Sequence, residues 1–437
     1  MKKTLAIALA LMLCLGLHAA CASPTVVIYD GASTPAADPI ASEEPSASEK
    51  PLEIPQGEIA MGFYMTAAHA SGHSGSSDAS AEAEGLAQTN VDIYAVTLNS
   101  EGVIVDCKID AIQCKTNFDA AGHITTDAAE PILSKMELQD DYAMRSASGI
   151  GREWFEQVEA LEQYCIGKTA DEVAGIALDD AGKATDADLI AGITMPLGDF
   201  IDGVVNACKN AKCYGAQEGD TLYLHSSAEH SSSSADATAE ADGLAQCDVT
   251  AGAYTLDGSG VITGLDLDCV QCKISFNASG EITSDQSNTS VKTKTELEYD
   301  YHMQGASPIG KEWFEQTAFF EEYCLGKTVG EIAGIAVNPD NGHVAESEVD
   351  LVAGTTMNIG AFVDVLTKSG AVSEPLEIPA GELAMGFYMK PALAFGHSGS
   401  SNASAEAEGL AQANVDIYAV TLNSEGVIVD CKIDAIQ

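Results

Sequence analysis

The sequence predicts an α+β fold, in which an antiparallel sheet with helices on one face is repeated in tandem. The stretch Val91–Gln113 recurs letter for letter at Val415–Gln437 and, in diverged form, at Val249–Gln271. Apolar residues alternate with their neighbours along these copies, which is the period of a half-buried strand. Helical spacing follows each of the first two copies, with Trp154 after the first and Trp313 after the second. Strands followed by helices are typical of an α+β unit.

Each copy is expected to be a β-hairpin. Turn-forming residues separate its two alternating runs, at Asn99–Gly102 in the first copy and Asp257–Gly260 in the second. Both loops close on a glycine that can adopt positive φ. An opening strand is expected at Gly57–Met65.

Helices are expected to follow the hairpin. One apolar face runs along Trp154–Cys165, and Gly167 ends that helix. Thr169–Glu172 has the pattern of a capping box that opens the next helix. A short apolar strand over Leu189–Thr194 is then expected to lead to a last helix over Leu197–Cys208.

The chain accordingly divides into five parts. These are a lipoprotein-type signal peptide (1–22), a disordered tether (23–56), unit one (57–213), unit two (216–370) and an incomplete third unit (375–437). We expect units one and two to fold as separate cooperative domains, each with its own sheet, helices and core. No function is assigned to the third unit.

The N-terminus predicts export. Met1–Leu17 combines a basic start with an apolar segment too short to span a bilayer as a mature helix. His18–Cys21 resembles a bacterial lipoprotein box, in which Cys21 would be acylated and become the mature N-terminus. Ordinary cleavage before Ser23 is the alternative. Both place the mature protein outside the cytoplasm, either lipid-anchored to the cell membrane or secreted.

Composition excludes several partners. The formal charge is −46 with a pI near 4.1, while 46% of residues are hydrophobic. This balance fits a folded, soluble acidic protein. Nucleic acid and anionic membrane surfaces are not expected partners, because no basic patch offsets the negative field. Membrane contact is expected through the lipid anchor only.

The cysteines and histidines point to no catalytic or metal site. Each unit places one cysteine on the sheet and one on the first helix, as Cys114 with Cys165 in unit one. A strand–helix disulfide and a pair of buried free thiols are both compatible with this spacing. His69 and His73 lie in a Gly/Ser loop without helical geometry, so no metal site is expected.

The last junction of each unit carries the functional hypothesis. It reads Gly192-Ile193-Thr194 before a helix with Phe200 in unit one, and Gly354-Thr355-Thr356 before a helix with Phe362 in unit two. With the hairpin and the Trp-containing helix, this order resembles the FMN-binding domain of flavoprotein subunits in Rnf and Nqr electron-transport complexes and related exported lipoproteins.

The resemblance implies an FMN site. In that family the junction threonine can carry FMN through a phosphoester bond, a place that Thr194 and Thr356 would hold. Gly192 and Gly354 would let the phosphate approach the backbone, and a helix N-terminus would stabilise it. Because Thr355 is smaller than Ile193, unit two is expected to bind FMN more tightly.

Basic residues retained in both units support a ligand. The retained pairs are Lys115/Lys273, Lys135/Lys294, Arg152/Lys311 and Lys168/Lys327. An FMN phosphate would require such cations in so acidic a chain, with Lys168 and Lys327 among the candidate contacts. The competing interpretation is that they neutralise nearby carboxylates such as Glu137 and Asp141.

For Gly167-Lys168-Thr169 and Gly326-Lys327-Thr328, a helix stop followed by an N-cap is favoured over a P-loop, because the earlier glycine is missing.

Two functions follow. The first is an exported flavin-binding, electron-transfer module with a redox partner at the cell envelope. The second is a non-catalytic cell-surface repeat protein, of the binding or spacer class, that has lost the cofactor site. Whether the protein is an enzyme stays open.

Overall fold

The structure is a computed structural model that describes residues 52–70, 75–285, 290–338, 341–368, 384–393, 413–422 and 428–436. The expected signal peptide with Cys21, and the tether up to residue 51, lie outside these residues. Within them, no helix is long and apolar enough to cross a membrane.

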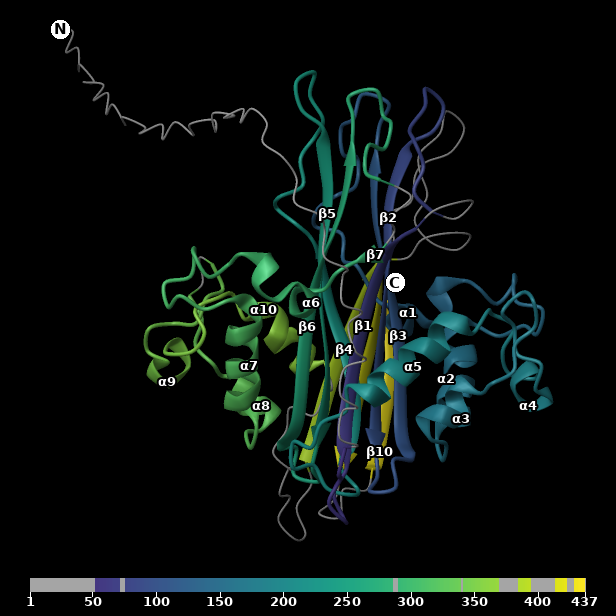
Figure 1. The fold of residues 1–437 in the computed structure, drawn as a ribbon, viewed down its shortest axis with the longest axis vertical. Coiled ribbons are helices and arrows are strands. Elements are labelled where there is room, and N and C mark those ends of the chain that lie inside the picture. The colour runs from purple at the N-terminus through teal and green to yellow at the C-terminus, as the bar shows by residue number, and fades with distance from the viewer. Residues whose placement is uncertain are drawn as a thin grey trace, which may run out of the picture. The chain divides into compact units, whose positions relative to one another are not determined.

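The described strands form three antiparallel sheets (Figure 1). Unit one contributes β1 (Ala60–His69), β2 (Gly85–Leu98) and β3 (Ile104–Phe118). Unit two contributes β4 (Thr221–His230), β5 (Gly243–Leu256), β6 (Ile262–Phe276) and the short β7 (Ser290–Val291). The third sheet holds β8 (Ala384–Leu393), β9 (Ala413–Leu422) and β10 (Ile428–Ile436).

The predicted hairpins of units one and two are confirmed. Leu98 is the last residue of β2 to pair with β3, opposite Ile104, and the register shifts by one bulge at Thr97 and Leu98. Gly102 and Gly260 close the turns with φ of +73° and +79°. Left-handed backbone of this kind favours glycine.

Ten short helices and two 3-10 turns follow the strands in the described residues. In unit one they are α1 (Lys135–Leu138), η1 (Gln139–Tyr142), α2 (Trp154–Cys165), α3 (Ala170–Ala174), α4 (Ala187–Ile190) and α5 (Gly198–Lys209). In unit two they are α6 (Lys294–Leu297), η2 (Glu298–Tyr301), α7 (Trp313–Cys324), α8 (Val329–Ala333), α9 (Val349–Val352) and α10 (Gly360–Thr367).

Most of the predicted helix signals of unit one are confirmed. The helix that starts at Trp154 ends before Gly167, which has a φ of +84°. Thr169 accepts from the Glu172 backbone N–H in a complete capping box. The strand expected over Leu189–Thr194 is wrong, because Asp186 caps a helical turn there by accepting from the Asp188 backbone N–H. A capped turn satisfies backbone groups locally, so no strand partner is needed.

Each of the two larger sheets carries helices on one face. In unit one, Tyr94 and Val96 of β2 point into a buried cluster with Trp154 and Leu161 of α2 and Val204 of α5. Unit two builds the corresponding cluster from β5, β6, α7 and α10. Mixed helices and antiparallel sheets in this arrangement confirm the α+β class.

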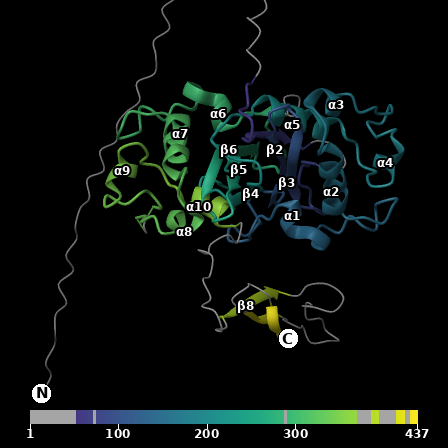
Figure 2. The ribbon, with the colours of Figure 1, turned by 90° about the horizontal axis from the view of Figure 1, so that it is seen from below.

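The opposite faces of these two sheets pack on each other. Strands β1 to β6 lie between the two groups of helices in both views (Figures 1 and 2). Ile93 and Ala95 of β2 join Val249 and Ala251 of β5 in one buried cluster. Beyond it, the rings of Phe118 and Phe276 stack at a centroid distance of 4.3 Å, and both side chains are fully buried.

This shared core corrects two expectations. Strand β2 is buried on both faces rather than one, because helices cover one side and the second sheet covers the other. Each unit has a helical core of its own, as expected, but the second faces of the two sheets are buried against each other, and the sheet of unit one also takes β7 from unit two. Burial of apolar surface between sheets is the dominant stabilising term for such a pair.

Backbone hydrogen bonds also cross between the units. Strand β7 of unit two pairs with β1 of unit one at Ala67 and Ala68. In the reverse direction, Ile132 of unit one forms a bridge with Ala228 of β4. The units are therefore joined by one strand pair and one isolated backbone bridge as well as by side-chain packing.

The strand–helix disulfide is contradicted by the strand pleat. Cys114 points into the core between the sheets, whereas Cys165 lies in the cluster under the helices. Cys107, seven residues before Cys114, is the β3 cysteine that shares the cluster with Cys165. An odd separation along a strand places two side chains on opposite faces. The cysteines of the described residues are free thiols.

Candidate functional site

The junction of unit one is bonded to helix α2. Thr194 donates its backbone N–H to Oε1 of Gln157 at 2.9 Å, and its hydroxyl donates to the same oxygen at 3.3 Å. Gln157 is fully buried. The threonine groups that would bind a phosphate are thus already used by a side chain of the protein.

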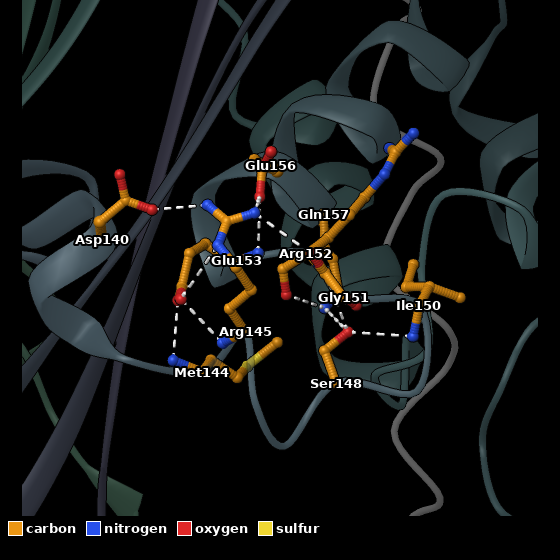
Figure 3. Close-up of polar contacts among 10 residues, drawn as sticks. All are labelled: Asp140, Met144, Arg145, Ser148, Ile150, Gly151, Arg152, Glu153, Glu156 and Gln157. Atoms are coloured by element: carbon orange, nitrogen blue, oxygen red, sulfur yellow. Dashed lines mark hydrogen bonds and ion pairs between the residues drawn. The ribbon is translucent and has the colours of Figure 1, made fainter.

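Gln157 is itself held in place. Its Nε2 donates to the Ser148 hydroxyl and to the Arg152 carbonyl, each at 3.2 Å (Figure 3). All the main polar groups of this amide are therefore satisfied, as expected of a buried side chain.

The loop that supplies Ser148 is fixed by a buried carboxylate. Glu153 accepts the backbone N–H groups of Met144 and Arg145, both at 2.7 Å. The Arg145 guanidinium also contacts Asp140 and Glu156, which Figure 3 shows on either side of it. These contacts hold the loop that carries Ser148 and Arg152, the partners of Gln157. They also explain why a glutamate stands directly before the first residue of α2.

Unit two repeats the junction contacts. Thr356 donates its backbone N–H and hydroxyl to Oε1 of Gln316 at 2.9 and 3.3 Å. Gln316 Nε2 donates to the Ser307 hydroxyl and the Lys311 carbonyl, each at 3.1 Å. The same closed arrangement therefore occurs in both units.

The junction glycines face helices. A Cβ built on Gly192 would lie 2.9 Å from Cβ of Ala160 and 3.6 Å from the Arg152 guanidinium. One built on Gly354 would lie 2.1 Å from the ring of Phe319. Each glycine thus allows close packing of the junction on α2 or α7. The open approach assumed at Gly354 is not present, because the Phe319 ring covers this glycine. The expectation that unit two binds FMN more tightly stays a prediction.

Thr355 does not offer a second hydroxyl to a ligand. Its side chain is fully buried, at the position where Ile193 packs in unit one. Its Oγ1 has no hydrogen-bond partner among the described residues. A buried hydroxyl without a partner destabilises the fold, and nothing in the structure accounts for it.

The helix start also lies away from the threonines. Helices α5 and α10 begin at Gly198 and Gly360, each four residues after the junction threonine. The predicted helix over Leu197–Cys208 is therefore confirmed. The expectation that its first turn binds a phosphate at Thr194 stays a prediction.

Lys168 and Lys327 are used at the ends of α2 and α7. Lys168 Nζ donates to the Tyr164 carbonyl at 2.6 Å and lies 3.7 Å from the centre of that tyrosine ring. Lys327 lies 3.8 Å from the ring centre of Tyr323 and donates to its carbonyl. A cation at a helix C-terminus and over an aromatic face is stabilising in itself.

Other retained cations have the same kind of role. Lys135 lies 5.0 Å from the ring centres of Tyr142 and Trp154. Lys294 occupies the corresponding place at 5.0 Å from Tyr301 and 5.2 Å from Trp313. Lys135 also acts on a carboxylate, because burial raises the pKa of Asp92 to about 6 and the charge of Lys135 opposes that rise. The interpretation that these cations neutralise nearby carboxylates therefore holds for Lys135, and phosphate binding stays a prediction. Glu137 pairs instead with Lys368, at 2.6 Å.

One cavity of about 260 Å³ opens between the units. Its titratable lining residues are Lys108, Asp110, Glu137, Glu162, His225 and Lys368. Burial raises the pKa of Glu162 to about 8 and that of Asp110 to about 6. Burial lowers the pKa of His225 to about 4, so this imidazole is neutral at pH 7.

Sequence reasoning missed these carboxyl groups and the junction glutamines. Gln157 and Glu162 fall on the face of α2 that carries Trp154, Val158 and Leu161, which is the available signal. Polar residues at apolar positions of a helix are buried and need specific partners. Glu162 meets this need with the Ile109 backbone N–H, at 2.7 Å from Oε1.

A second cavity, of about 500 Å³, gathers cations. Lys273, Lys292 and Lys294 line it together with His69 of unit one. The whole chain has 20 lysines and arginines, so three at one cavity is a local concentration. Neither cavity is lined by Gly192–Thr194 or Gly354–Thr356. Among the described residues, no group of histidine, cysteine and carboxylate side chains is arranged to hold a metal ion.

Comparisons with known proteins give no relative. No protein-family model matches the chain, no curated protein matches it, and no solved structure matches it.

Proposed function

We propose that the chain is an exported, lipid-anchored tandem-repeat protein that acts as a binding or spacer module rather than as a flavin carrier. In this proposal the junctions Gly192–Thr194 and Gly354–Thr356 are structural. The observation that carries it is the pair of hydrogen bonds from each junction threonine to a buried glutamine.

A flavin phosphate could replace these bonds only at a cost. It would have to displace the Oε1 atom of Gln157 or Gln316 from the threonine N–H. The displaced amide oxygen would remain buried without a donor, which costs about 1–3 kcal/mol. The phosphate would also need the space that Ala160 or Phe319 occupies beside the glycine.

The shared core favours the spacer role. Two units that bury their sheet faces against each other and share a strand pair form one body, in contrast to domains joined by a flexible linker. A net charge of −46 keeps such a body soluble and repels other acidic surfaces.

An anionic ligand is the second candidate, and the lysine-lined cavity favours it. Lys273 and Lys294 are two of the cations retained in both units, and Lys292 adds a third. A phosphate-bearing ligand such as FMN would find its counter-charges there rather than at the junctions. Flavin electron transfer with a redox partner at the cell envelope would then depend on this cavity.

Titration of the full mature chain with FMN, followed by flavin fluorescence, tests both candidates. The first candidate predicts no binding at ~100 μM flavin, which is far above the Kd of a working flavin site. Binding that is lost in Thr356→Val would overturn it, because that change removes the junction hydroxyl at nearly constant volume.

Two further variants locate any binding that occurs. Binding that survives Thr356→Val but is lost in Lys273→Gln/Lys292→Gln would establish the second candidate. Lys183→Gln/Lys209→Gln is the matched control, since it removes the same charge from exposed positions of unit one.

A further inference from the structure

Units one and two pack through equivalent parts of their surfaces. Ala79 of unit one donates its backbone N–H to the Gly280 carbonyl of unit two, and Ala237 of unit two donates to the Gly122 carbonyl of unit one, both at 2.7 Å. Ala79 corresponds in sequence to Ala237, and Gly122 corresponds to Gly280. The same contact is therefore made in both directions, as in an interface with two-fold symmetry.

Other contacts between the units follow the same symmetry. Val291 of β7 pairs with Ala67 of β1. Ile132, the counterpart of Val291, forms a bridge with Ala228 of β4, the counterpart of Ala67. The stack of two phenylalanine rings joins a residue to its own counterpart. One face of this kind of sheet is therefore covered by a second sheet of the same kind.

The third sheet repeats the sheet of unit one in sequence and in register. The identical stretches are 384–389, 414–422 and 428–436, which match 60–65, 90–98 and 104–112. The strands also pair alike, with Tyr388 opposite Tyr418 as Tyr64 is opposite Tyr94. The third sheet therefore holds the same residues at the same register positions.

These residues are less covered in the third sheet than in unit one. Ala95 lies in the core between the two larger sheets and is fully buried, whereas Ala419, at the same position of β9, is only partly buried. Cys107 is 1% exposed, whereas Cys431, at the same position of β10, is exposed. Among the described residues, unit one thus shows what covers this face, and that cover is a second sheet.

The edge of the third sheet is less suited to a partner than its face. Lys390 and Pro391 stand on β8 where unit one has Thr66 and Ala67, beside the pairing with β7. Proline cannot donate a backbone hydrogen bond, and a lysine on an edge strand opposes the addition of another strand. Association through the face is therefore favoured over extension of the sheet.

We propose that the chain dimerises through its third sheet. The sheet β8–β10 of one chain packs on the sheet β8–β10 of a second copy, through the face that carries Ala419. A two-fold axis relates the two copies, as it approximately relates units one and two within one chain. This pairing buries the face without displacing either of the first two units.

The expected pairing is weak. No linker joins two chains, so the high effective concentration that a linker gives units one and two is absent. The net charge of −46 on each chain also makes two copies repel each other. We therefore expect a Kd on the order of 10 μM at physiological salt, and tighter pairing at higher salt because the repulsion is screened.

Sedimentation of the full mature chain measures this pairing. A reducing agent is present throughout, because Cys213 and Cys431 are exposed thiols that could cross-link copies. Between about 1 and 100 μM the average mass should rise from that of one chain towards that of two, and no further. A monomer at ~100 μM, at both low and high salt, would overturn the proposal, as would growth beyond a dimer.

Two neighbouring positions of β9 locate the interface. Successive side chains of a strand point to opposite faces, and in unit one Ala95 lies between the sheets while Val96 lies under the helices. Ala419→Glu should weaken the dimer at least roughly a hundred-fold, because the two-fold axis brings the charges of both copies into one apolar interface. Val420→Glu adds the same charge to the same strand on the other face and should leave the dimer nearly unchanged. Equal losses in the two variants, or a loss in Val420→Glu alone, would overturn the assignment of the face.

A mixing experiment distinguishes the third sheet of a second copy from its unit two. The sheet of unit two covers this same sequence in unit one, so an exchange between copies could place the third sheet of one chain there. In such an exchange, labelled wild type would still bind the Ala419→Glu variant, whose unit two is intact. The proposal predicts that wild type and Ala419→Glu do not pair, and a mixed dimer would overturn it.

Discussion

Glu162→Gln should stabilise the protein in alkaline solution and leave it nearly unchanged in mild acid. Burial raises the pKa of Glu162 from 4.5 to about 8, and its Oε1 accepts the Ile109 backbone N–H. A glutamine oxygen can accept the same bond without ever becoming charged. The variant therefore isolates the cost of ionising this one side chain.

The sign follows from proton binding. Between pH 4.5 and about 8 the folded state holds a proton on Glu162 that the unfolded state has lost. Stability from this group is therefore complete below pH 4.5 and falls as pH rises towards about 8. The full shift corresponds to roughly 5 kcal/mol at about 1.4 kcal/mol per pKa unit. Water in the adjoining cavity reduces that cost, so we expect about 2–3 kcal/mol.

Thermal unfolding of the wild type and the variant from pH 5 to pH 9 provides the assay. The gain in Tm for Glu162→Gln should grow with pH and reach roughly 5–10 °C at pH 9, given about 2–4 °C per kcal/mol for a body of this size. Glu101→Gln, in the exposed hairpin turn of unit one, should show no such trend. A pH-independent difference, or a loss of stability at pH 9, would refute the reasoning.

Three other changes test the packing. Phe118→Ala should lower the free energy of unfolding by about 3–5 kcal/mol, because it removes the stack on Phe276. Calorimetry should show both units melting together, and separate transitions would argue against a shared core. An isolated chain of residues 57–213 should fail to melt cooperatively, because its inter-sheet face is left exposed; a sharp transition by circular dichroism would favour independent units. Gly354→Ala should lower the free energy of unfolding by about 1–3 kcal/mol, because the added methyl group meets the Phe319 ring. Gly198→Ala, which has open space around it, should lower it much less in urea titrations. Equal effects would contradict the close approach of Gly354 to the ring.

Local signals of the sequence predicted local structure well. The glycines at 102 and 167 mark a turn and a helix end because left-handed backbone strongly favours that residue. The capping box at Thr169 starts a helix because its partners lie within one turn. The apolar run over residues 189–194 predicts a strand where the structure has a turn capped by Asp186, because so short a run has no period that separates a strand from a helical turn.

The contacts between units were not predictable in the same way. The alternation along β2 predicts that Ile93 and Ala95 are buried, although the neighbouring Tyr94 and Val96 are also apolar. A nearly continuous apolar run signals two buried faces but does not say what covers each.

The candidate site shows a different limit. The order of elements around Thr194 and Thr356 resembles an FMN-binding domain, and the helices that follow are present. The hydrogen-bond partners of these threonines are Gln157 and Gln316, and the burial of the two glutamines follows from tertiary packing. Polar residues at apolar helix positions were the available sign, repeated in both units.

Absorbance of the native mature protein between about 350 and 500 nm tests the central claim most directly, because a bound flavin absorbs there and the protein does not. The closed junctions at Thr194 and Thr356 predict no flavin band in protein purified without added cofactor. A flavin band that stays with the chain after denaturation, and is lost in Thr356→Val, would contradict the proposal that the junctions are structural.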